Sequence, residues 1–317
     1  MRFLVAAALF RPLALVPVAC SMPKSGGQAT RTESVTDRRT LLLALAAAGL
    51  PSRSPRAQSS SIDWMWRWTA NAPLIVAGVP QPGGDRSGEG SARTIEIPIM
   101  DAMVLKGVHE GPLTISHPNF GSGVIDFDQP WRFKGRRAVL FIRAFGEATP
   151  PLVNVGAVLE GDDAGIAAVR TEIALQARLL ASWKRDPSDP FYRQVEALIG
   201  RIMTLKDTGS PVYEAQAEAF ADLEALGEPA LPAIVAWMDD RRPLPYPAIS
   251  FVNKAVDRFE GMRHYGPKLM VDAMAGVLNQ LTGESFGNIY SGASDAERDL
   301  AVKGWRMYAA RRAAGLT

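Results

Sequence analysis

The chain has 317 residues, of which 47% are hydrophobic and 21% charged, a globular composition that excludes wholesale disorder and allows about two domains. Residues 1–57 hold 8 Lys and Arg against 2 Asp and Glu; subtracting these from the totals of 35 and 33 leaves 27 and 31, so residues 58–317 carry −4. Nucleic-acid binding needs a cationic face, and an acidic remainder argues against that class of function.

Residues 1–57 form a basic leader that is predicted to be an export signal. An apolar run covers residues 41–50, and small residues lead to a possible cleavage site between Ala57 and Gln58. A basic segment, a short apolar core and a small-residue end are typical of a secretory signal. A membrane span needs roughly 20 apolar residues, so no transmembrane segment is expected in the mature chain.

Two arginines stand directly before the apolar run of the leader. Residues 37–42, Asp-Arg-Arg-Thr-Leu-Leu, resemble a twin-arginine export signal through Arg38 and Arg39, which implies a periplasmic or extracellular protein. The alternative is an ordinary amphipathic N-terminal helix. Translation starting at Met22 rather than Met1 would give the signal a usual length.

The only cysteine of the chain, Cys20, lies in the leader. Residues 18–21, Val-Ala-Cys-Ser, could be a lipoprotein cleavage site, which would anchor the protein through a lipid on Cys20. Under either account the mature chain has no thiol. Internal disulfides and thiol catalysis are therefore excluded.

Residues 58–72 are predicted to be an aromatic linker. Trp64, Trp66 and Trp68 recur at a spacing of two, which could cover one face of a strand or lie at a membrane interface. We favour a third interpretation, an N-terminal segment that packs onto the folded protein.

Residues 73–160 are predicted to form a small β domain. Short runs that are β-branched, aromatic or alternating in polarity are typical of strands, and a Gly/Ser-rich loop at 83–91 separates the first two. Several short strands in this length favour a small antiparallel barrel or sandwich. The predicted strands are residues 74–79, 94–99, 103–106, 113–117 and 139–145.

Two short motifs in this region resemble an OB-like, netrin-type barrel of exported bacterial proteins. Residues 104–107 read Val-Leu-Lys-Gly, and residues 135–143 read Gly-Arg-Arg-Ala-Val-Leu-Phe-Ile-Arg. The resemblance implies a barrel that serves more often as an interaction module than as an enzyme, and fold alone does not establish function.

Residues 161–317 are predicted to be helical. Apolar residues recur at helical spacing, and Ser294-x-x-Glu297 is a capping box that opens the last helix. The predicted helices are residues 166–180, 195–202, 210–226, 231–240, 249–259, 269–281 and the segment after 294.

Residues 227–234, Gly-Glu-Pro-Ala-Leu-Pro-Ala-Ile, look like the start of the second helix of a HEAT-type repeat. Residues 278–287 are similar to terminal segments of exported HEAT-like proteins. This resemblance implies stacked helical hairpins with an extended surface for partners. The expected fold class is thus α+β multidomain, a small β barrel or sandwich followed by a helical HEAT-like domain.

Catalytic motifs are absent from the sequence, and we expect no cofactor. The polar candidates are His117, Asp126 and Asp128: the two carboxylates would share a strand face and could suit a cation or acid–base work, with a solvated strand edge as the alternative. Near the C-terminus, Tyr290 and Trp305 beside Arg306 would either form an aromatic recognition spot or pack between the last helices.

These observations favour an exported, non-enzymatic binding or scaffold protein of the bacterial envelope, whose partner is a protein or an envelope polymer. The alternative is an exported hydrolase, or a periplasmic enzyme that carries a metal or cofactor, with its site in the β domain.

Overall fold

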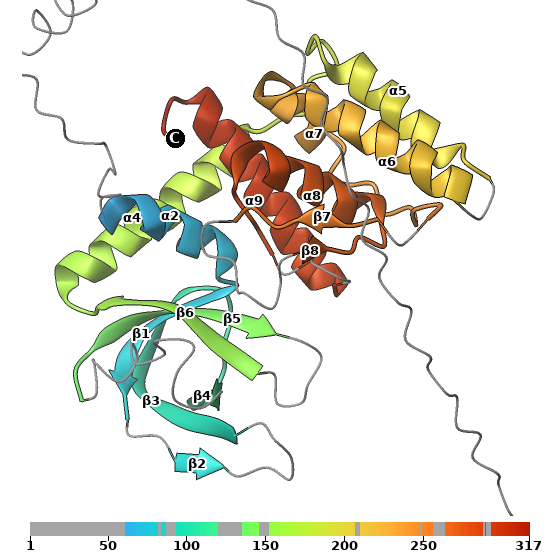
Figure 1. The fold of residues 1–317 in the computed structure, drawn as a ribbon. Coiled ribbons are helices and arrows are strands. Elements are labelled where there is room, and N and C mark those ends of the chain that lie inside the picture. Colours follow the sequence, from blue (N-terminus) through green and yellow to red (C-terminus); the bar gives the residue numbers. More distant parts are fainter. Residues whose placement is uncertain are drawn as a thin grey trace, which may run out of the picture. The chain divides into compact units, whose positions relative to one another are not determined.

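The fold begins with a helix, continues through an antiparallel sheet and ends in a helical half (Figure 1). A computed structural model describes residues 61–81, 84–86, 93–119, 135–145, 152–206, 210–246, 249–255, 264–287, 289 and 293–317. All of these residues belong to one compact unit, 57–317.

The sheet runs in the order β2-β3-β1-β5-β6, with β4 paired to β3, and its pairings are antiparallel. Among the described residues no strand pairing joins β4 to β6, so the sheet is open. The fold is therefore α+β, with an open antiparallel sheet before the helices. The strands are β1 (Leu74–Pro80), β2 (Gly84–Arg86), β3 (Arg93–Lys106), β4 (Leu113–Asn119), β5 (Ala138–Phe145) and β6 (Leu152–Glu160).

Strand β3 differs from the sequence prediction. The strands expected at 94–99 and 103–106 are one continuous strand that runs through Asp101, a residue with a positive φ of 51°. The first half of β3 pairs with β2 and β4, and its second half pairs with β1. One long strand can therefore border three neighbours.

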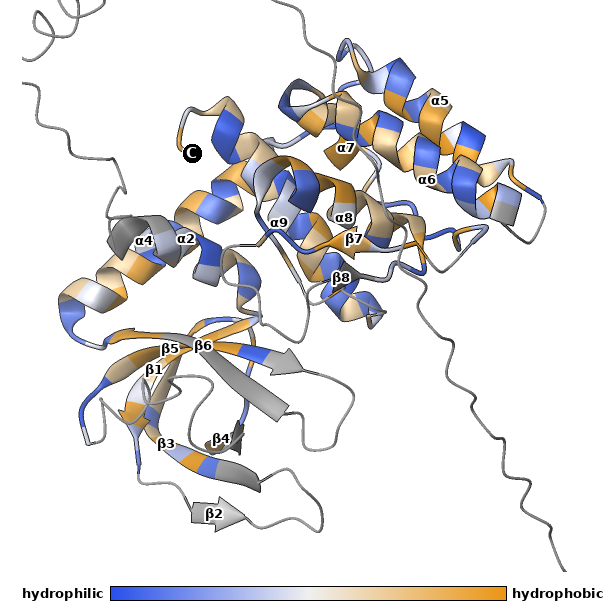
Figure 2. Cartoon of the chain, in the orientation of Figure 1, coloured by the Kyte–Doolittle hydropathy of each residue, from blue (hydrophilic) through white to orange (hydrophobic). Residues whose placement is uncertain are grey.

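Both faces of the sheet centre are buried. Along β1, Val76 faces one core and Ile75 faces the other, and along β5 Leu140 and Phe141 alternate in the same way. This is the two-residue period of a strand. Figure 2 shows the apolar character of β1 and β5. Residues from β3 and β4 complete one core, and residues from α2 and α4 cover the other.

The helical half contains six α-helices in the described residues, and the helices predicted at 166–180, 195–202, 210–226 and 269–281 are confirmed. The capping box is confirmed too, because the Ser294 side chain accepts from the Glu297 amide and the Glu297 side chain accepts from the Ser294 amide. The helices are α4 (Asp163–Ser182), α5 (Tyr192–Met203), α6 (Ser210–Ala225), α7 (Leu231–Val235), α8 (Met270–Thr282) and α9 (Asp295–Ala313).

Two helix predictions were wrong. The helix expected over 231–240 ends at Val235, and the described part of 249–259 holds the short strand β7 (Phe251–Val252), which pairs with β8 (His264–Tyr265). Here tertiary contacts override the apolar spacing. Phe251 lies edge-on against Phe220, and the amide after β7, that of Lys254, donates to Asn279 Oδ1 of α8 at 2.7 Å.

The tryptophan cluster forms helix α2 (Ser61–Asn71), not a strand. On a helix, residues two positions apart are rotated by about 200° around the axis. Trp64 and Trp68 therefore share a side of the helix, and Trp66 points to the opposite side. Trp64 meets Phe141 of β5 edge-on, with ring centroids 6.2 Å apart. Trp66 stacks on Tyr308 of α9 at 5.9 Å. The segment therefore packs onto the folded protein, as the favoured interpretation predicted, and it also joins the sheet to the helical half.

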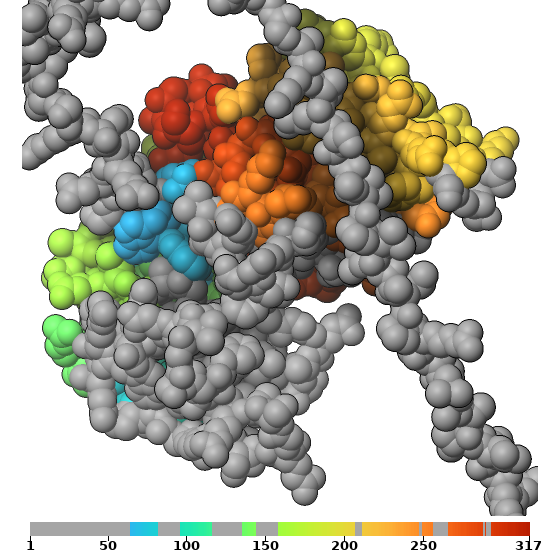
Figure 3. All heavy atoms as spheres, viewed as in Figure 1, coloured from blue at the N-terminus to red at the C-terminus, as the bar shows by residue number. Residues whose placement is uncertain are grey.

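Polar contacts attach α2 to the loop after α8. The Arg67 guanidinium donates to both carboxylate oxygens of Glu284, from Nε at 2.8 Å and from Nη2 at 2.6 Å. The Asn71 amide donates to the carbonyl of Ser285 and accepts from the amide of Gly287, each at 3.0 Å. Figure 3 shows α2, in blue, beside α4 on the molecular surface.

The two motifs behind the barrel resemblance both contact α2. Lys106 of the first motif donates to the carbonyl of Thr69, whose usual helical donor would be residue 73; that residue is a proline and has no N–H. Arg143 of the second motif lies over the Trp68 ring at 4.5 Å. These motif residues therefore have a structural role at the junction.

Lys106 makes the junction sensitive to pH. Burial, and secondarily the charge of Lys303, lowers the pKa of Lys106 from 10.5 to about 8. Between pH 8 and pH 10.5 the Lys106 side chain holds a proton in the unfolded chain that it has released in the folded protein. The free energy of unfolding therefore rises with pH in this window. We expect the free energy of unfolding of the wild type, relative to Lys106→Met, to increase by about 2 kcal/mol from pH 7.5 to pH 10. Urea denaturation at both pH values measures it; a difference that does not change with pH would contradict it.

Candidate interaction surface

The described residues do not test the polar site proposed for the β half, because Asp126 and Asp128 lie outside them. His117 lies in β4, where its backbone pairs with Ile95. No group of three His, Cys, Asp or Glu side chains among the described residues could hold a metal. The remaining candidates lie outside the described residues: Arg38, Arg39, Ala57, Gln58, Asp126, Asp128 and Tyr290.

In the aromatic spot proposed near the C-terminus, Trp305 and Arg306 point to different parts of the molecule. Trp305 is 1% exposed and meets Phe286 edge-on at 4.9 Å, so it packs inside the helical half. Its neighbour Arg306 points to a different surface. In the part of the chain that the structure describes, no helix combines the length and apolar character that a membrane crossing requires.

The surface around Arg306 combines two tryptophans, two arginines and a carboxylate from three separate segments. Its residues are Trp183, Arg185, Trp237, Asp239 and Arg306, and we call them the arginine–tryptophan face. Trp and Arg are the residue types most enriched at the energetic centres of protein interfaces.

Local structure fixes each segment of the face. Trp183 directly follows α4 in extended conformation, with its amide still bonded to the carbonyl of Leu179 at 3.1 Å. Trp237 and Asp239 lie in the turn that follows α7. That turn is attached to α8, because the amide of Val271 donates to the carbonyl of Asp240 at 2.8 Å. Arg306 projects from the middle of α9.

Cations stack on both tryptophans of the face. The guanidinium of Arg306 lies 4.4 Å from the centroid of the Trp183 ring, and that of Arg185 lies 5.4 Å from the centroid of the Trp237 ring. The two arginines also meet at one carboxylate oxygen, Oδ2 of Asp239: Arg306 Nη2 bonds to it, and Arg185 Nη2 lies 3.7 Å away. The tryptophans and Asp239 thus hold both guanidinium groups in fixed positions.

The face is partly open to solvent. The side chains of Arg185 and Asp239 are 40% and 54% exposed, and that of Arg306 is 23% exposed. Both tryptophans are half-buried. Two buried donors, Arg306 Nε and Trp237 Nε1, have no hydrogen-bond partner among the described residues. The face therefore has unused donors as well as accessible charge.

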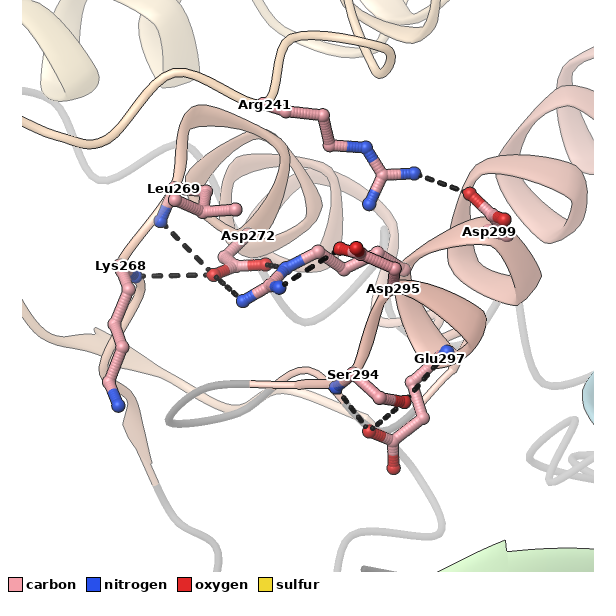
Figure 4. Close-up of polar contacts among 9 residues, drawn as sticks. Arg241, Lys268, Leu269, Asp272, Ser294, Asp295, Glu297 and Asp299 are labelled. Carbon is pink, nitrogen blue, oxygen red and sulfur yellow. Dashed lines mark hydrogen bonds and ion pairs between the residues drawn. The ribbon is translucent and has the colours of Figure 1, made fainter. Parts of the chain in front are cut away.

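Further Arg–Asp pairs lie around the start of α9 (Figure 4). Arg241, on the same turn as Asp239, donates to Asp299 at 2.6 Å. Asp272 is fully buried and accepts from Arg298 Nε at 2.8 Å and Nη2 at 3.1 Å, and also from the amides that start α8. These pairs fix α9 against α8 and the turn.

Two ion pairs of this region, Asp240 with Arg242 and Asp272 with Arg298, shift the pKa of one of their members. Burial acts to raise the pKa of Asp240, but hydrogen bonds and charge from Arg242 outweigh it, and the pKa lies below its ordinary value. The hydrogen bond to Asp272 raises the pKa of Arg298 above its usual range. These pKa shifts favour the ionised forms of Asp240 and Arg298.

Sequence reasoning identified Arg306 but missed the rest of the face. Trp183 and Trp237 each stand next to a charged run, Lys184-Arg185 in one case and residues 239–242 in the other. A tryptophan beside charges just after a helix is the local signal. The sequence alone does not bring two such segments together, because 54 residues separate the tryptophans.

The chemistry of this surface is that of a binding site for an anionic group, because guanidinium groups donate paired hydrogen bonds and stack on aromatic rings. No family model, curated protein or solved structure matches the chain.

Proposed function

We propose that the mature protein is an exported, non-enzymatic binding protein of the bacterial cell envelope, and that it engages a protein partner through the arginine–tryptophan face. One observation carries the proposal: Arg185 and Arg306 are stacked on tryptophans and held by Asp239 on a partly exposed surface. Ordering long side chains before binding lowers the entropic cost of association.

The proposed export follows from the leader, and its cleavage is compatible with the fold. Removal of residues 1–57 would leave three residues before α2, which starts at Ser61. The helix that joins both halves would therefore stay intact in the mature chain. A lipid anchor at Cys20 is the alternative route to the envelope.

We also propose finer folds for the two halves, with the domain boundary at residues 160 and 161. In the β half, the backbones of the two edge strands β4 and β6 approach each other, and a pairing between them would close the order β4-β3-β1-β5-β6 into an OB-like barrel. In the helical half, α5 packs on α6 and α8 packs on α9, an arrangement compatible with HEAT-like hairpins.

The proposed function is tested by capturing partners from envelope extract with purified mature protein. We expect wild type to retain a defined partner and the variant Arg185→Ala/Arg306→Ala to lose at least about tenfold of it, which corresponds to 1.4 kcal/mol or more. The matched control is Arg193→Ala/Arg201→Ala, which removes two exposed arginines of α5.

Thermal denaturation of all three proteins shows whether each is folded. Equal capture by wild type and the face variant, or equal loss in the face variant and the α5 control, would contradict the proposal.

A further inference from the structure

Arg306 uses only part of its hydrogen-bonding edge. The Nε and Nη2 groups of a guanidinium form a fork that fits the two oxygens of a carboxylate. Asp239 accepts from Nη2 alone, and Nε is buried with no partner among the described residues. The fork of Arg306 is therefore half occupied.

Other arginines of the same chain show the complete arrangement. Arg298 donates Nε and Nη2 to separate oxygens of Asp272, and Arg67 donates the same two groups to Glu284. Arg242 does so toward Asp240. The pairing at Arg306 is thus less complete than at these three arginines.

Asp239 is suited to leave this position. Its side chain is 54% exposed, it stands on a turn rather than in a helix, and both arginines share its Oδ2. Exposed pairs of this kind contribute little to stability. The face has two arginines against this one carboxylate.

We propose that the face binds an acidic peptide segment of the partner, and that a carboxylate of this segment replaces Asp239 on Arg306 and accepts from both Nε and Nη2. The inference rests on the proposed function and names the partner's chemistry. A peptide carboxylate is favoured over a phosphate because the present occupant is itself an aspartate on a turn of this chain. Asp239 then acts as an internal competitor.

Isothermal titration calorimetry of the mature protein with blocked hexaglutamate tests this, with hexaglutamine as the neutral probe. We expect wild type to bind hexaglutamate, Asp239→Ala to bind it about tenfold more tightly, and Arg306→Lys to bind it about tenfold more weakly. The matched control is Asp299→Ala, which removes an exposed carboxylate of α9 that pairs with Arg241. It should change affinity by less than about threefold, because it alters general charge but not the fork.

Three results would overturn the inference. They are no binding of hexaglutamate, equal gains in the Asp239 and Asp299 variants, or tripolyphosphate binding at least tenfold more tightly than hexaglutamate with the same dependence on Arg306. Face-dependent capture of an envelope partner without hexaglutamate binding would overturn this inference and leave the proposed function standing. Hexaglutamate binding without such capture would count against the proposed function alone.

Discussion

Replacement of Trp66 by alanine should lower the free energy of unfolding by about 3–5 kcal/mol, the range for deleting a large aromatic side chain from a core. Trp66 is 5% exposed and contacts Phe286 and Tyr308, and Arg67 and Arg311 lie against its ring. Its loss opens the junction between α2 and the helical half. Urea denaturation followed by circular dichroism measures the change.

The control for this prediction is Trp183→Ala, which removes a half-buried tryptophan from the arginine–tryptophan face. It should cost clearly less, because part of its ring already contacts solvent. If Trp66→Ala costs less than about 1 kcal/mol, α2 does not hold the two halves together as described.

The second large effect is expected at the buried pair of Asp272 and Arg298. The substitution Arg298→Met leaves a fully buried carboxylate without its cation, a change that typically costs 3–5 kcal/mol. Adding Asp272→Asn should recover much of this loss. The asparagine oxygen can still accept from the amides of Lys268 and Leu269, and no unpaired charge remains.

Arg201→Met provides the comparison, because Arg201 pairs with Asp222 on an exposed surface. We expect a cost below about 1 kcal/mol there. A single Arg298→Met variant as stable as Arg201→Met would show that the buried pair has no special role, and failure of Asp272→Asn to restore stability would place the cost elsewhere.

Local patterns were sufficient to predict most of the regular elements. The helical spacing of apolar residues located α4, α5, α6 and α8, and the capping box marked the start of α9. Alternating or β-branched runs located β1, β4 and β5. Two strands of the large antiparallel sheet were not predicted. Strand β2 lies inside the segment 83–91 that was expected to be a loop. Strand β6 was missed because Asn154 and Gly156 interrupt an apolar run with residues that strands disfavour.

Long-range contacts decided what the sequence could not. Tryptophans at a spacing of two fit a strand in isolation, but a helix lets α2 contact the sheet on one side and α9 on the other. The segment around Phe251 has helical apolar spacing. It is not helical, because the backbone amide of Lys254 donates to Asn279 and the Phe251 ring packs against Phe220. Neither choice can be read from neighbouring residues.

The candidate surface was less predictable than the fold. Its residues come from the end of α4, the turn after α7 and the middle of α9. These three segments are far apart in the sequence. Arg306 directly follows Trp305 in the sequence, but Trp305 packs inward while Arg306 stacks on Trp183. Only the tertiary arrangement shows which tryptophan the arginine uses.

The most direct test of the central proposal is photo-crosslinking in living cells with a photoreactive amino acid at Lys184, an exposed position between Trp183 and Arg185 of the arginine–tryptophan face, and at the exposed control Ala197 of α5. We predict an adduct with one envelope protein from position 184 and none from position 197. Adding Arg306→Ala should remove that adduct. No adduct from position 184, or the same adducts from both positions, would contradict a partner-binding role for this face.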